Sequence, residues 1–250
     1  MKNIIAVINQ KGGVGKSTTA FMLGKALELK NFKTLFIDLD AQGNLSYTLK
    51  AATSGLTSLD ILTGKAAAVD AVQHTEQGDI IASSPSLAVA DSIIIETGKE
   101  YRLKKALAEI SGYDYILIDT PPALGIMTVN ALTASTGAMI PAQADIYSLQ
   151  GISQIYNTIS AVQEYTNPGL KILGILLTRY NPRTIIGRDV AEMTEEAALS
   201  IKSKLYKTKI RECTAIKESQ IMQTDIFKYA PNSNAAVDYK NLAEEIINGI

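Results

Sequence analysis

The chain has 250 residues, of which 46% are hydrophobic, and its formal net charge at pH 7 is -1. This length and composition predict one α/β domain over residues 1–250, and the near-neutral charge excludes strong overall attraction to nucleic acid. No apolar run approaches the roughly 18 residues of a membrane span, and no small-residue cleavage site follows the N-terminal apolar run. We therefore expect a cytoplasmic protein.

Apolar runs of strand length recur along the chain, at 3–8, 34–39, 79–83, 115–119, 137–142 and 171–178. Such continuous runs are typical of parallel strands buried on both faces. Segments with helical periodicity lie between or after them, at 17–30, 101–110, 149–165, 189–205 and 237–247. This alternation predicts a doubly wound, mainly parallel sheet with helices on both faces.

The segment INQKGGVGKSTT, residues 8–19, is typical of a phosphate-binding loop between a strand and a helix. The pattern G-x-x-x-x-G-K-[ST] ends at Gly15, Lys16 and Ser17, although Gln10 stands where its first glycine is expected. Loop amides, the helix N-terminus and a lysine together favour binding of phosphate. A plain glycine turn between a strand and a helix would not need this combination. We expect the nucleotide to contact Gly12, Gly13, Val14, Gly15, Lys16, Ser17 and Thr18.

Carboxylates follow or end two of the predicted strands. Because ligands bind beyond the carboxyl ends of strands in an open α/β sheet, Asp40 and Asp119 should converge on the phosphates. The hydroxyl of Ser17 can ligate Mg²⁺, Asp119 can support the ion through a water, and Asp40 can orient the attacking water. Asp38 either contributes to the phosphate site, like Asp40 and Asp119, or has a structural role inside the sheet.

With KGGVGKST, DLDAQGN and IDTPP in this order, the chain resembles the ParA/Soj family of DNA-partitioning ATPases. These belong to the deviant Walker A group of P-loop proteins, which also contains MinD. The likeness continues through 130–132, 144–151, 176–184 and 229–246. It implies an ATP- and Mg²⁺-dependent enzyme of plasmid or chromosome segregation. Its weak hydrolysis would be stimulated by a ParB-like centromere-binding partner.

The same resemblance gives the extra lysine of the loop, Lys11, a role. It implies that ATP binding forms a homodimer in which Lys11 reaches the phosphates held by the other subunit. A lysine supplied in this way neutralises the transferring phosphoryl group only when two loaded subunits meet. We therefore expect Lys11, Lys16 and Asp40 to form the catalytic set, whereas the alternative is that Lys11 serves its own subunit or faces solvent.

Basic residues are concentrated in residues 171–217, which hold ten basic and five acidic groups. The resemblance implies that the dimer binds nonspecific double-stranded DNA on the nucleoid, which such a segment would favour. The residues expected to contact DNA are Arg183, Lys202, Lys204, Lys207, Lys209 and Lys217. Ala215 stands where Soj-like members carry a second DNA-contacting arginine, and a solvated helix face is the alternative for any one lysine.

Proteins with three other functions carry the same kind of loop. A MinD-like protein positioned on the membrane needs a basic amphipathic C-terminal helix, whereas this chain has Glu244 and Glu245 there. Metal-cluster carriers need paired cysteines, and Cys213 is the only cysteine. An amide-forming P-loop ligase stays open, although Lys11 would have no clear purpose in it. We expect no membrane partner.

Overall fold

The computed structural model describes residues 2–52 and 54–249, without the side chains of 146–150. Seven strands of these residues form one sheet in the order β3-β4-β2-β5-β1-β6-β7. The strands are β1 (Asn3–Val7), β2 (Thr34–Asp38), β3 (Val72–Thr75), β4 (Gly78–Ile81), β5 (Tyr115–Asp119), β6 (Gly137–Gln143) and β7 (Lys171–Thr178). All neighbouring pairs are parallel except β3 and β4.

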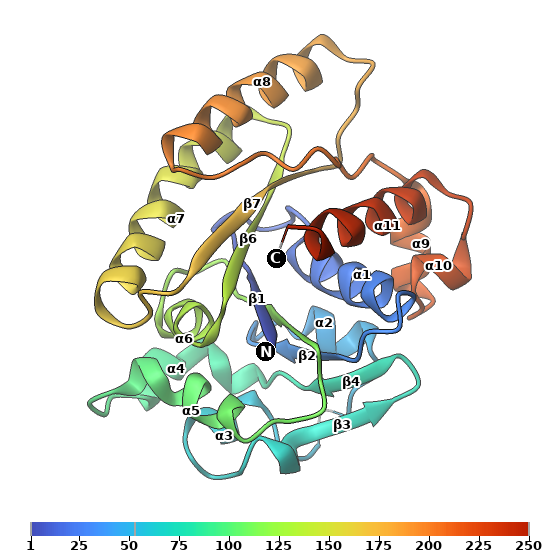
Figure 1. The fold of residues 1–250 in the computed structure, drawn as a ribbon. Coiled ribbons are helices and arrows are strands. Elements are labelled where there is room, and N and C mark those ends of the chain that lie inside the picture. The colour runs from blue at the N-terminus through green and yellow to red at the C-terminus, as the bar shows by residue number, and fades with distance from the viewer. Residues whose placement is uncertain (1, 53, 250) are drawn as a thin grey trace.

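Helices cover both faces of this sheet (Figure 1). They are α1 (Lys16–Glu28), α2 (Asn44–Thr48), α3 (Ser58–Leu62), α4 (Ala90–Ile93), α5 (Arg102–Ala108), α6 (Ile126–Ala134), α7 (Ile146–Tyr165), α8 (Ile185–Ser200), α9 (Thr214–Ile221), α10 (Ile226–Tyr229) and α11 (Asn234–Ile247). The predicted doubly wound, mainly parallel P-loop fold is confirmed.

Each face of the sheet has its own hydrophobic core. In the central strand β5, Ile116 and Ile118 enter a core with α3, α5, α6 and α7. Tyr115 and Leu117, which alternate with them, enter the opposite core with α1, α10 and α11. Because successive side chains of a strand point to opposite faces, a strand covered on both sides must be apolar throughout. This requirement explains the unbroken apolar runs of the sequence.

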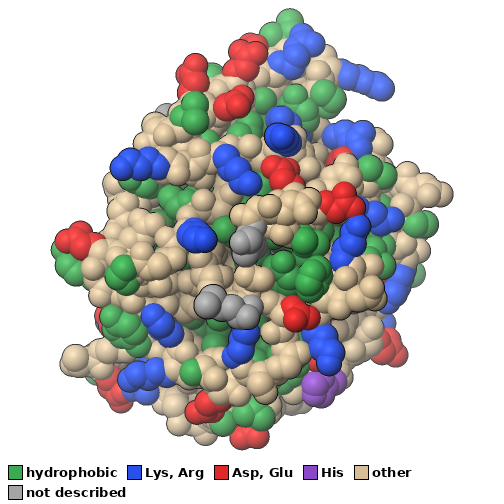
Figure 2. All heavy atoms as spheres, in the orientation of Figure 1, with side chains coloured by type: hydrophobic (Ala, Val, Ile, Leu, Met, Phe, Trp, Pro, Cys, Tyr) green, Lys and Arg blue, Asp and Glu red, His purple; other side chains and the backbone are tan. Residues whose placement is uncertain are grey.

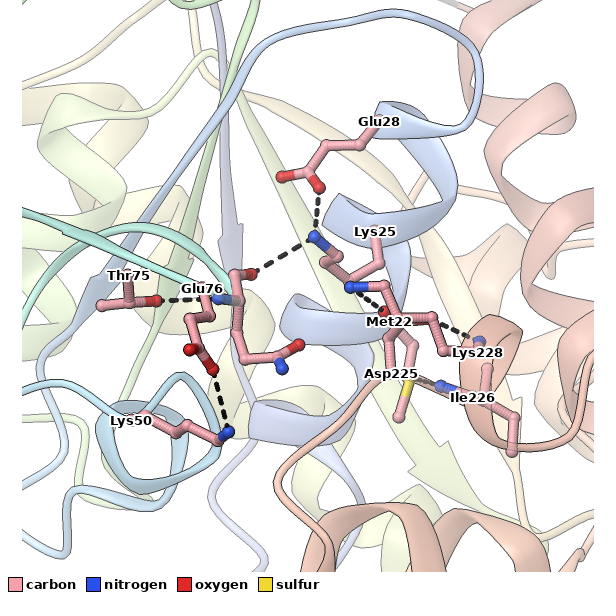
Figure 3. A network of polar contacts seen from close by, with 10 residues as sticks. Met22, Lys25, Glu28, Lys50, Thr75, Glu76, Asp225, Ile226 and Lys228 are labelled. Carbon is pink, nitrogen blue, oxygen red and sulfur yellow. Dashed lines mark hydrogen bonds and ion pairs between the residues drawn. The ribbon is translucent and has the colours of Figure 1, made fainter.

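Polar contacts join α1 to elements at both of its sides (Figure 3). The Lys25 ammonium pairs with Glu28 and donates to the Gln77 carbonyl, 3.2 Å away, between β3 and β4. On the other side, the Ile226 amide lies 3.4 Å from the Met22 sulfur, and Asp225 caps α10 by accepting from the Lys228 amide. These contacts fix the helix that follows the phosphate-binding loop.

Several elements differ from the sequence prediction, which did not include the helices α2, α3, α4, α6, α9 and α10. The edge strand β3 was not expected, because its sequence, VQHT, is short and polar, as an edge strand allows. The helix predicted at 189–205 instead runs from Ile185 to Ser200. Residues 201–211 leave it and run beside β7, where the Tyr206 amide donates to the Ile175 carbonyl at 2.9 Å. Burial of Tyr206, 1% exposed, between exposed lysines explains this extended course.

Close approach of α1 to β2 makes Gly24 a sensitive position. A Cβ atom there would overlap the ring of Phe36, which is fully buried. Alanine improves helix propensity by about 1 kcal/mol, but overpacking of a core costs about 1–3 kcal/mol. We expect Gly24→Ala to lower the free energy of unfolding in urea, and Phe36→Leu to reduce that loss in the double variant. An alanine variant more stable than the parent would contradict this packing.

Candidate functional site

The loop between β1 and α1 is held open by glycines and by the ends of two further strands. Gly13 and Gly15 have φ of +76° and +89°, a region that residues with a Cβ rarely adopt. The Thr178 hydroxyl, at the end of β7, donates to the Val14 carbonyl at 2.8 Å, and Gln143 of β6 donates to the Gly13 carbonyl at 3.0 Å. These bonds turn loop carbonyls toward the sheet.

Lys16 begins α1, and its side chain is almost buried at 7% exposure. Burial lowers the pKa of its ammonium group, while the charges of Asp119 and Asp40 act in the opposite direction. The ammonium also lies 3.4 Å from the Lys11 carbonyl across the loop. A partly desolvated cation between these acids and the loop amides is suited to phosphate.

Asp119 ends β5 and is fully buried. Neither of its carboxylate oxygens makes a hydrogen bond of ordinary geometry within the described residues. Burial and the neighbouring Asp38 raise its pKa well above the usual range, while the Ser17 hydroxyl and Lys16 partly oppose the shift. Because an unpaired buried carboxylate is costly, the site fits a bound cation. Ser17 and Asp119 are the residues that would hold Mg²⁺.

Asp38 is the last residue of β2, and Asp40 lies two residues further along the chain. The surroundings of the two carboxylates differ. The Asp38 carboxylate is fully buried and accepts from the Asp40 amide at 3.0 Å and from Ser46, at 2.8 Å from the amide and 2.7 Å from the hydroxyl. Asp40 accepts from the Gln42 amide at 3.0 Å and lines the pocket beside the loop. The geometry gives Asp38 a structural position and leaves Asp40 at the pocket.

A pocket of about 550 Å³ opens beside the loop. Gly12, Gly13, Gly15, Lys16, Ser17, Thr18 and Asp40 line it, together with Gln42, Asn44, Tyr47, Thr48, Pro122, Lys217, Gln220 and Ile221. A smaller hollow of about 260 Å³ adjoins it through shared residues and extends to Thr178, Ile210, Ile216 and Tyr239. Together they can take an extended ligand with one polyanionic end and one less polar end.

Lys11 lies at the exposed edge of the loop. Its ammonium group is 2.6 Å from a carboxylate oxygen of Asp145, which follows β6, and the two side chains are 35% and 32% exposed. The Lys11 amide donates to the Asn9 side chain at 2.9 Å, which fixes the backbone at this position. Within this chain, Lys11 therefore pairs with an acid.

The residues predicted to contact DNA do not form one group. Lys202, Lys204 and Lys207 are exposed along the segment 201–211, and Arg183 is exposed before α8. Lys209 is half-buried, with its ammonium 5.7 Å from the centre of the Tyr180 ring. Lys217 lies on α9 and lines the pocket beside the phosphate-binding loop. On the face in Figure 2, basic and acidic side chains are interspersed.

Sequence reasoning did not identify Gln143, Thr178 and Gln220 as site residues. Gln143 and Thr178 end parallel strands, and the rule that selected Asp119 could have found them. Gln220 donates to the Thr18 hydroxyl at 2.8 Å from α9, more than 200 residues away in sequence. No local pattern marks that contact.

The acidic outer face of α11 contacts the chain itself. Glu244 pairs with Lys30 at 2.6 Å, and Glu245 accepts from the amides of Lys207 and Thr208 at 3.0 and 3.1 Å. Tyr239 and Leu242 of this helix are buried in the core beside α1. No helix of the described residues is long and apolar enough to cross a bilayer.

Asp38 should make stability depend on pH. Burial raises its pKa from 3.8 to about 6, so the folded protein binds the proton more tightly than the unfolded chain does. Stability from this group is complete below pH 3.8 and is lost as pH rises to about 6, a difference of about 3 kcal/mol. Asp38→Asn should flatten that fall in urea unfolding of the nucleotide-free protein. Profiles of parent and variant that run parallel would contradict the assignment, and exposed Asp70→Asn is the control.

Comparison with known proteins identifies the family of this chain. A family model described as an AAA domain matches residues 2–172. Sporulation initiation inhibitor protein Soj of Bacillus subtilis is 39% identical over 98% of both chains. Chromosome partitioning protein ParA of Caulobacter vibrioides is 36% identical over 98% of this chain and 93% of its own. A structure of cobyrinic acid a,c-diamide synthase from Mycobacterium smegmatis, with bound ATP analog and magnesium, is 32% identical with a TM-score of 0.86, covering 99% of this chain and 95% of that one. The chain belongs to the ParA/Soj family of ATPases.

Proposed function

We propose that this protein is an Mg²⁺-dependent ATPase of plasmid or chromosome segregation. ATP binding forms a homodimer that holds nonspecific duplex DNA, and slow hydrolysis, accelerated by a ParB-like partner, releases it. The observation that carries the proposal is the loop with two lysines: Lys16 lines the pocket and interacts electrostatically with the buried carboxylate of Asp119, while Lys11 lies at the exposed edge of the loop. The relatives named Soj and ParA support the segregation role.

The triphosphate occupies the larger pocket in this proposal. Lys16 and the loop amides bind the β- and γ-phosphates, and Thr18 with the neighbouring amides binds nearer the α-phosphate. Mg²⁺, held by Ser17 and supported by Asp119, would neutralise charge that develops on the phosphates. The nucleoside extends into the hollow lined by Ile210, Ile216 and Tyr239.

Asp40 is the residue proposed to align the attacking water. It lies 8% exposed at the pocket, and its hydrogen bond from the Gln42 amide fixes the carboxylate. By contrast, the Asp38 carboxylate accepts hydrogen bonds from the amide and hydroxyl of Ser46. A fixed acceptor beside the phosphates orients a nucleophile without covalent chemistry of its own.

Lys11 acts on the nucleotide of the other subunit. To reach it, the ammonium group must leave Asp145, and an ion pair this exposed contributes only about 0–1 kcal/mol. A triphosphate offers more negative charge in a drier setting, so the exchange is favourable once two loaded subunits meet. ATP thereby holds the dimer together, and hydrolysis of ATP sets the lifetime of the dimer.

DNA binding is assigned to the exposed lysines of residues 201–211 and to Arg183. Lys202 is exposed in the turn after α8, and Lys204 and Lys207 are exposed on the extended stretch that follows, so all three are free to meet a phosphate backbone. Basic and acidic side chains are interspersed on the face in Figure 2, so we infer that two copies are needed for useful affinity. The acidic face of α11, with Glu244 at its surface, disfavours the MinD-like alternative at a membrane.

An amide-forming ligase is the second candidate, because the 32% identical structure carries a synthase name. A ligase would use the same pocket for ATP but would not need Lys11 in a partner subunit. Nucleotide-dependent DNA binding therefore separates the two functions.

The test of the proposed function is DNA binding with ATP against ADP. With ATP and Mg²⁺, the protein should retard arbitrary duplex DNA at low salt and release it as salt rises, because each phosphate contact contributes a slope of about -0.9 in log K against log salt. Joint replacement of Lys202, Lys204 and Lys207 by alanine should reduce that slope, whereas exposed Lys65→Ala should not. Retention on anionic lipid vesicles instead of DNA would favour the MinD-like role.

Lys11→Ala should weaken ATP-dependent dimerisation while ATP binding by the monomer persists, because the loop keeps Lys16. Sedimentation velocity with ATP and with ADP measures the change, and we expect the dimer dissociation constant to rise at least tenfold, as for loss of a charge-assisted contact. Lys207→Ala is the matched control and should dimerise like the parent. A dimer that forms equally well without the Lys11 ammonium would contradict the role in trans.

A further inference from the structure

Helix α9 is fixed against the start of α1 by one hydrogen bond. Gln220 donates from its side chain to the hydroxyl of Thr18, 2.8 Å away, in the first turn of α1. Lys217 lies three residues before Gln220, and residues at this spacing share a helix face. The contact of Gln220 therefore brings Lys217 to the same side of α9, above the phosphate-binding loop.

Lys217 stands where the larger pocket meets the smaller hollow. Both cavities are lined by Lys217, and the other residues that they share are Gly13, Gly15, Thr18 and Gln220. One cavity continues to Lys16 and Asp40, and the other to Ile216 and Tyr239. A ligand that occupies both must pass this junction.

The other cations near the junction already have partners. Arg211 binds Asp238 through two nitrogens, with a shortest distance of 2.6 Å. Arg179 lies 4.0 Å from Glu212. Within the described residues, Lys217 has no acidic group within 4.0 Å, and its neighbour Glu218 accepts from the Tyr229 hydroxyl instead.

We propose that Lys217 binds the α-phosphate of the nucleotide rather than DNA. The inference rests on the proposed ATP site, because the loop and Lys16 take the β- and γ-phosphates and the hollow takes the nucleoside. What remains at the junction between them is the α-phosphate. An exposed ammonium on a flexible stem can reach it and supply a charge-assisted hydrogen bond. Since ATP and ADP both carry this phosphate, Lys217 contributes equally to both.

Titration calorimetry of ATP and of ADP with Mg²⁺, without DNA, tests the assignment. Lys217→Ala should raise both dissociation constants by the same factor, about tenfold, as expected for one charged hydrogen bond. Lys217→Arg should recover most of the affinity, and replacement of the exposed Lys65 by alanine, away from the pocket, should stay within about twofold of the parent. Equal melting temperatures of the nucleotide-free variants confirm that folding is intact.

DNA binding at saturating ATP provides the second readout. A nucleotide contact leaves the DNA affinity and salt slope of Lys217→Ala close to those of the parent. Unchanged ATP and ADP affinity together with weaker DNA binding would overturn the proposal and assign Lys217 to the DNA surface. If the parent binds ATP but never binds DNA, the segregation function fails, while equal losses of ATP and ADP affinity on substitution still support the role of Lys217.

Discussion

The site depends on the burial of Asp119 at the centre of the sheet. Its strand lies between β1 and β2, and the register places Asp119 beside Val7 on one side and Asp38 on the other. Two carboxylates thus meet at one buried edge with one ammonium group, that of Lys16. Such an arrangement is unfavourable by itself and becomes favourable when a cation and phosphates complete it.

The rest of the fold keeps this edge in place. Apolar strands covered on both faces fix the register, and the ends of β6 and β7 hold the loop through Gln143 and Thr178. Helix α1 begins at Lys16, so its packing against Phe36 also sets the position of this lysine at the pocket. In the same way, Asp38 accepts from the Asp40 amide and so supports the loop that places Asp40 at the pocket.

The sequence was informative where local pattern and tertiary position coincide. Six strands followed from apolar runs, and the place of Asp119 at the end of a strand followed from the run before it. The loop motif located Lys16, Ser17 and Thr18, which line one pocket. Prediction failed where a partner distant in sequence decides the conformation. Residues 201–205 have helix-compatible composition, but Tyr206 needs the core beside β7, and the chain leaves the helix to reach it. The pairing of Lys11 with Asp145 and the location of Lys217 likewise depend on contacts that no spacing reveals.

The contacts of α11 with residues 201–211 affect which substitutions those residues can accept. Glu245 holds this segment through the amides of Lys207 and Thr208, and Tyr206 anchors it in the core, so its path is set by main-chain and aromatic contacts. Lys204 and Lys209 add contacts to the rings of Tyr206 and Tyr180, whereas Lys202 and Lys207 are exposed side chains on this path. Substitutions at Lys202 and Lys207 can therefore change the surface potential of residues 201–211 while the backbone keeps the same course.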